Sequence, residues 1–146
     1  MDSENYNEEL RKVWRPNWLS SINELTSLRL QKNSWLDKNA PSAHWTFVEF
    51  MCSYFDNLGI DDNYKDPLKR KLLSSEEFEI IRPWHEALDK YKSPKNNDYA
   101  VNKILEDPSW LEIIEVGIKV KNELSKILSD EEKNILLEEI DHRKYC

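Results

Sequence analysis

Apolar side chains recur every three or four positions along most of this chain, which is the spacing of one face of an α-helix. The longest such stripe lies between residues 107 and 128 and consists of Trp110, Ile113, Ile114, Gly117, Val120, Leu124, Ile127 and Leu128. No segment alternates apolar and polar residues as a half-buried strand does. The pattern therefore predicts an all-α fold, in which residues 1–146 form a single compact domain of about six helices.

Prolines and capping motifs set several expected helix boundaries. Pro16 is expected to end or kink a first helix over residues 5–14, so that a second helix begins after it and runs to Lys32. Ser74 and Ser129 each stand three residues before a glutamate. This spacing is that of a capping box, so each serine predicts the start of a helix.

Prolines and polar residues determine what we expect of three further stretches. Pro83 leaves two alternatives open, since it either kinks the helix that begins near Ser74 or starts a new helix. Residues 60–73 are polar and then basic, and we expect a loop followed by one helical turn. At Asp107-Pro108 an N-cap residue is followed by proline, which predicts the start of the long helix that ends near residue 128.

The most apolar part of the chain lies near residues 43–58, where apolar groups occur all round the helical cylinder. Such a helix must be contacted on several sides, so we expect an aromatic helix at the centre of the fold. Ser42 is expected to cap its start. Gly59 is expected to end it, because glycine readily adopts the left-handed conformation found after many helices.

Glycine is scarce, with two residues in 146. A nucleotide-binding loop uses glycines to bring the backbone close to phosphate, so this chemistry is disfavoured. Gly117 lies inside a predicted helix, where it costs about 1 kcal/mol relative to alanine. Close packing of another helix would explain it, and we expect Trp45 or Trp84 as the neighbour.

Acidic residues dominate the last third of the chain. The net charge is −7, and residues 96–146 alone hold twelve acidic and seven basic side chains. Nucleic acids would be repelled by such a surface, whereas a basic protein partner would be attracted. A simpler interpretation is also open, namely that these charges only keep the domain soluble.

The sequence shows no arrangement that predicts catalysis, a metal ion or a cofactor. His85 and Asp89 are spaced as two metal ligands on a helix could be, but no further ligand follows at suitable spacing. Cys52 lies in an apolar stretch and Cys146 is the last residue, so no disulfide framework is expected. Whether His44 or His85 lines a pocket is left open by the sequence.

Candidate partner-binding residues are one tryptophan and a set of carboxylates. Trp35 lies among polar residues, and exposed tryptophans are enriched at binding hot spots. The carboxylates come from the acidic last third and are Glu112, Glu115, Glu123, Glu138, Glu139 and Asp141. Together they would contact lysines and arginines of a partner.

These observations favour a non-catalytic acidic protein that binds a basic site, as an inhibitor or an immunity protein that neutralises a bacterial toxin nuclease does. Two alternatives stay open. One is a structural or adaptor protein that self-associates, and the other is an all-α enzyme or small-molecule binder with an aromatic pocket containing His44, His85 and Glu49. The polar start of the chain and the absence of a long apolar run favour a cytoplasmic, non-membrane protein.

Overall fold

The structure, a computed structural model, describes residues 2–61 and 63–144. Within them it contains eight α-helices, two 3₁₀ turns and no strand, so the all-α prediction is confirmed. The elements are α1 (Asp2–Leu25), α2 (Leu28–Trp35), α3 (Phe47–Phe55), α4 (Lys65–Lys69), α5 (Ser75–Lys90), η1 (Pro94–Asn96), α6 (Val101–Glu106), α7 (Pro108–Ser125), α8 (Asp130–Leu137) and η2 (His142–Lys144). In this part of the chain, no helix combines the length and apolarity that crossing a membrane requires.

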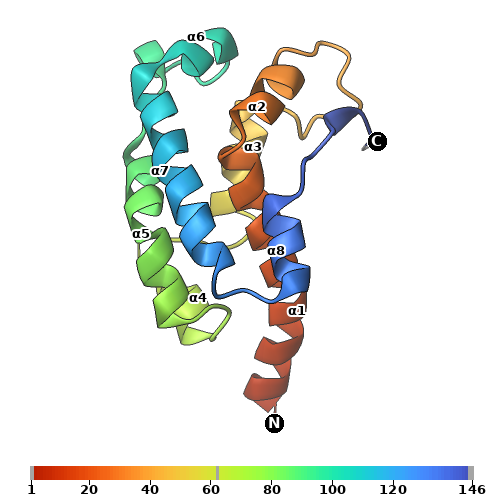
Figure 1. Cartoon of the computed structure of the whole chain (residues 1–146), viewed down its shortest axis with the longest axis vertical. Helices are drawn as coiled ribbons and strands as arrows, with labels where there is room; N and C mark the ends of the chain where they lie inside the picture. Colours follow the sequence, from red (N-terminus) through yellow and green to blue (C-terminus); the bar gives the residue numbers. More distant parts are fainter. Residues whose placement is uncertain (1, 62, 145–146) are drawn as a thin grey trace.

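The helices pack into a single compact domain (Figure 1). The antiparallel pair α5 and α7 forms one side, and α8 lies along α1 on the other. Beyond α8, the chain runs as an extended segment past α2 toward the loop that joins α2 to α3. This segment, residues 138–143, is called the C-terminal segment below.

The first predicted helix boundary is wrong. Pro16 lies inside α1, which continues to Leu25, and the break falls instead at Thr26 and Ser27. Trp14 and Trp18 are both buried and hold the helix against the core on either side of the proline. Tertiary burial therefore outweighs the local cost of Pro16.

Side-chain caps explain where the next two helices begin. Ser27 starts α2 by accepting a hydrogen bond from Leu30 N. The predicted cap at Ser42 is wrong, because Thr46 performs that role for α3 by accepting from Glu49 N. Gly59 has a φ of +63°, and the chain folds back there as predicted. Its N–H donates to Asp56 O, and the next N–H donates to the carbonyl of Phe55, the last residue of α3, which is the Schellman pattern.

Residues 60–73 contain one short helix, α4, as expected. The capping box at Ser74 is complete, and α5 continues without a break through Pro83. Asp107 caps α7 by accepting from Ser109 N, with Pro108 in the first helical position as predicted.

The helix α3 lies at the centre of an aromatic core. Phe47 packs edge-on against Trp35 and Trp110, and Tyr54 packs in the same way against Trp84. These contacts connect α3 to α2, α7 and α5, which confirms that this helix is contacted on several sides. All six tryptophans are buried.

Gly117 allows α7 to approach its neighbours closely. A Cβ atom built there would lie 2.5 Å from Thr26 Cγ2 and 2.8 Å from Trp84 Nε1. Trp84 is thus the neighbour predicted for this glycine, while Trp45 is not among its nearest atoms. Thr26, which the sequence did not indicate, is the closest.

Arg15 joins three helices through five hydrogen bonds. It makes two with Glu77 of α5, two with Glu132 of α8 and one with Leu72 O, at 2.7–3.1 Å. Burial opposes the charge on Arg15, but the two carboxylates raise its pKa. The carboxylate of Glu132 therefore binds Arg15. Of the capping box predicted at Ser129, the structure shows one half, in which the Ser129 side chain accepts a hydrogen bond from Glu132 N.

Candidate functional site

The six predicted carboxylates are all exposed, but they fall into two groups. One group lies on α7 and consists of Glu112, Glu115 and Glu123. The other lies in the C-terminal segment and consists of Glu138, Glu139 and Asp141. The fold therefore does not gather all six into one continuous site.

The α7 group is partly neutralised by lysines. Glu123 forms an ion pair with Lys126 at 3.0 Å. Glu112 lies in a groove between α5 and α7 that Lys90 and Lys92 also line. Since nearby lysines offset these carboxylates, this face presents a mixed surface to a partner.

The end of α8 presents carboxylates beside an exposed apolar side chain. Glu138 and Asp141 have no ion pair among the residues that the structure describes. Leu137, the last residue of α8, keeps 49% of its surface exposed. Leu136, its neighbour on the same helix, is fully buried. We name Leu137, Glu138, Glu139 and Asp141 the acidic surface.

Asn23 of α1 holds this surface in place. Its side-chain amide donates to Glu138 O at 2.7 Å and to Ile135 O at 3.3 Å, which satisfies carbonyls at the end of α8. Lys121 of α7 donates in turn to Asn23 Oδ1 and to Thr26 Oγ1. Burial lowers the pKa of Lys121. The C-terminal segment therefore starts from a fixed backbone position.

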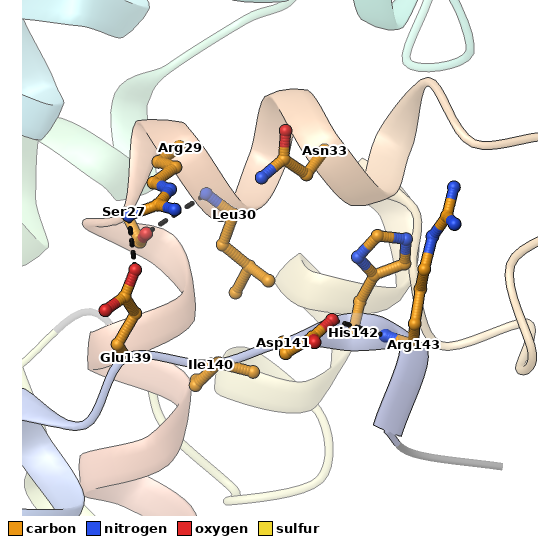
Figure 2. Close-up of a pocket in the computed structure, with 9 residues that line it drawn as sticks. All are labelled: Ser27, Arg29, Leu30, Asn33, Glu139, Ile140, Asp141, His142 and Arg143. Carbon is orange, nitrogen blue, oxygen red and sulfur yellow. Dashed lines mark hydrogen bonds and ion pairs between the residues drawn. The ribbon is translucent and has the colours of Figure 1, made fainter.

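Figure 2 shows the groove that this segment forms with α2, with a volume of about 570 Å³. Arg29 reaches from the first turn of α2 to Glu139 on the opposite wall. Further along, Asp141 Oδ1 accepts a hydrogen bond from Arg143 N. Two arginines line this groove beside the two carboxylates, so its charge is balanced.

His142 fastens the far end of the C-terminal segment. Its Nε2 lies 2.8 Å from Asp37 Oδ2, in the loop between α2 and α3, and its ring packs against the edge of Trp45. The hydrogen bond from His142 lowers the pKa of Asp37. The segment is thus held at both ends, by Asn23 and by Asp37.

A second cavity, of about 280 Å³, also borders the segment, through Glu138 and Ile140. Its lining residues are Ser20, Glu24, Ser42, His44, Trp45, Glu138 and Ile140. His44 Nε2 lies 2.8 Å from Glu24 Oε2, and this hydrogen bond raises the pKa of His44 against the opposing effect of burial. The question left open for His44 is answered, because it lines a cavity beside a carboxylate.

His85 is instead fully buried in a chain of hydrogen bonds. Trp18 Nε1 donates to the Tyr64 hydroxyl, which is bonded to the Tyr54 hydroxyl, and the latter is bonded to His85 Nδ1 at 2.9 Å. His85 Nε2 lies 3.1 Å from Asp61 O, a carbonyl that can only accept. His85 thus links α5 to the loop before α4.

The prediction that Trp35 is an exposed contact is wrong. Only 7% of its surface is exposed, and its ring packs against Phe47, Phe50 and Trp110. Its polar sequence neighbours misled the prediction, because Ser34 is itself buried and donates a hydrogen bond to Leu30 O, while Asn33 is exposed on α2. Gln31, one turn earlier, is itself buried and accepts a hydrogen bond from Trp110 Nε1.

No cluster of three or more potential metal ligands occurs among residues 2–61 and 63–144. Cys52 is a half-buried free thiol, and burial raises its pKa. Cys146 lies outside the described residues.

Comparisons with known proteins identify no relative: no family model, no curated protein and no solved structure matches this chain.

Proposed function

We propose that this domain is a non-catalytic protein-binding module, an inhibitor or immunity-type protein that covers a basic site on its partner. The observation that supports it is the acidic surface, where exposed carboxylates adjoin the exposed Leu137 on a fixed backbone. An apolar contact beside charges is the usual composition of a binding surface. The carboxylates would meet lysines and arginines of the partner.

The arrangement of charge supports the same proposal. Carboxylates that stabilise the fold, such as Glu77 and Glu132, are fully engaged by Arg15. Glu138 and Asp141 are left available to a partner, and their field would steer a basic protein toward the surface. Steering of this kind weakens as salt screens the charges.

The proposal also includes a class of partner and a cellular location. A bacterial toxin nuclease is the partner class that an acidic inhibitor of this kind would fit, because its active cleft is basic. The cytoplasmic location expected from the sequence also stays a prediction. Self-association is the alternative, and sedimentation at increasing protein concentration would detect it as a rise in mass.

Site-specific crosslinking tests the proposal directly. A photoreactive benzoylphenylalanine replaces Leu137, and in a control protein it replaces Tyr99, which is also exposed. After irradiation in the source cell, we expect a basic protein crosslinked at position 137 and absent at position 99. Identical crosslinks at both positions, or an acidic partner at position 137, would contradict the proposal.

Salt dependence of the purified pair tests the mechanism. Between about 50 and 500 mM salt the association rate should fall by roughly tenfold or more if electrostatic steering contributes. A rate that does not change over this range would remove the acidic surface as the steering element.

A second candidate function, small-molecule binding, is favoured by one observation. His44 lies in a cavity beside Glu24, and such pairs of titratable groups often mark binding sites. The same cavity borders the acidic surface through Glu138, so both functions can be tested at one place.

A further inference from the structure

The cavity beside His44 carries negative charge whatever the protonation state of the histidine. Glu24 and Glu138 line it, and neither lysine nor arginine does. Protonation of His44 would offset one carboxylate and leave the other. The electrostatic environment therefore favours a cation.

Glu24 presents an unpaired oxygen to this cavity. Its side chain is only 10% exposed, and His44 occupies Oε2, while Oε1 has no hydrogen-bond partner among the described residues. This oxygen is not among the buried side-chain atoms that lack a partner, so it is open to solvent. A donor that enters the cavity could therefore reach Oε1 and replace water there.

The remaining walls suit a flat cation. Trp45 is one of the lining residues, and guanidinium groups stack on aromatic rings better than ammonium groups do. Ser20 and Ser42 contribute hydroxyl oxygens that can accept further N–H donors. The volume of about 280 Å³ is near the lower limit of ligand pockets, which fits a single side chain or a small ligand.

We propose that this cavity binds a guanidinium group, the end of an arginine side chain from the basic partner. Glu24 and Glu138 would accept its N–H groups, and Trp45 would cover one of its faces. This inference rests on the proposed function for the source of the arginine, but the chemistry of the cavity can be tested without a partner. Glu138 belongs to both surfaces, so an arginine inserted here would anchor a protein that contacts the acidic surface.

Titration with ethylguanidinium, followed by NMR of the Trp45 indole and His44 ring signals, tests the chemistry. We expect saturable shifts with wild-type protein and none with ethylurea, a neutral molecule of the same shape. Glu24→Gln should weaken binding by roughly tenfold, the loss of one charge-assisted hydrogen bond. Glu138→Gln, which changes an exposed residue and does not endanger folding, should weaken it several-fold.

Glu139→Gln is the matched control. It removes one negative charge from the same segment, but Glu139 lines the groove with Arg29 and not this cavity. Ethylguanidinium should bind this variant within about twofold of the wild type, since only long-range charge is lost. Equal binding of ethylurea, or equal weakening by E24Q and E139Q, would overturn the proposal.

The partner distinguishes the two sources of a guanidinium group. With the protein crosslinked at position 137 in hand, we expect E24Q to lower its affinity and excess ethylguanidinium to compete with it. If E24Q weakens ethylguanidinium but leaves the partner's affinity unchanged, the ligand is a free small cation and the proposed arginine is wrong. If no partner is captured while ethylguanidinium still depends on Glu24, the proposed function fails and the cation site stands.

Discussion

The two ends of α8 carry acidic residues in opposite circumstances. At the start of the helix, Glu132 is held by two hydrogen bonds from Arg15, whose side chain is 13% exposed. Past its end, Glu138 and Asp141 are exposed and have no ion pair in the described part of the chain. Glu139 meets Arg29 at the surface, where both side chains are about three-quarters exposed.

The difference separates charges that stabilise the fold from charges that are free to recognise a partner. A charge whose hydrogen-bonding capacity is used inside the protein has little left for another molecule. An exposed carboxylate contributes little to stability, because water solvates it well in the folded and unfolded states. Acidic residues thus have two different roles at the start of one short helix and just past its end.

Removing Arg15 should have the largest effect on stability and tests the distinction between the two groups of carboxylates. Arg15→Met leaves the buried Glu77 and the partly buried Glu132 without a counter-charge, and we expect a loss of about 3 kcal/mol in the free energy of unfolding. Urea denaturation followed by circular dichroism measures it. The matched control, Arg29→Met at the exposed pair, should change stability by less than about 1 kcal/mol. Equal effects of the two variants would refute the distinction.

Removing Asn23 should have the next largest effect. Asn23→Ala leaves the carbonyls of Ile135 and Glu138 and the amino group of Lys121 without this partner, at a cost of about 1–3 kcal/mol. Amide hydrogen exchange should rise in residues 138–143 more than elsewhere. If exchange rises uniformly over the molecule, Asn23 does not hold the C-terminal segment in particular.

The pair formed by His44 and Glu24 predicts a smaller, pH-dependent effect. The folded state raises the pKa of His44 above 6.5, so its contribution is present below pH 6.5 and is lost as the pH rises through the raised value. The free energy of unfolding should therefore fall as the pH rises above 6.5. His44→Gln should flatten this part of the profile, and a variant that keeps the wild-type slope would assign it to another group.

The smallest effect on stability is expected from the acidic surface. The combined variant Glu138→Gln, Glu139→Gln and Asp141→Asn should unfold within about 0.5 kcal/mol of the wild type, since these residues are exposed. Its association with the basic partner should nevertheless slow, and the rate should depend less on salt. A large loss of stability would place these carboxylates with the Arg15 group.

Local signals predicted several caps and turns of this fold, although the cap expected at Ser42 is provided by Thr46. Ser74, Asp107 and Gly59 act where the sequence placed them, because each is determined by backbone geometry within a few residues. Gly117 even indicated a long-range contact, since a glycine inside a helix needs a neighbour to justify it. Pro16 failed as a signal because distant residues bury the tryptophans beside it.

The candidate site was less predictable. Exposure of the carboxylates follows from their chemistry, but their division between α7 and the C-terminal segment depends on how the helices pack. The cavity residues Ser20, Glu24, Ser42, His44 and Glu138 come from three separate stretches of chain, so no spacing in the sequence reveals them. Asn23 was missed for the same reason, because its partners lie more than a hundred residues away.

The burial of every tryptophan gives the protein a useful optical property. The emission maximum of an indole shifts to longer wavelength when water reaches the ring. The folded chain should therefore emit at short wavelength, and its emission maximum should shift to longer wavelength on unfolding. Binding at the acidic surface would leave most of this emission unchanged, because the rings are buried. Trp45 borders the cavity, and a guanidinium group stacked on it should alter the intensity without the wavelength shift of unfolding. A single fluorescence titration could therefore tell occupation of the cavity from loss of the fold.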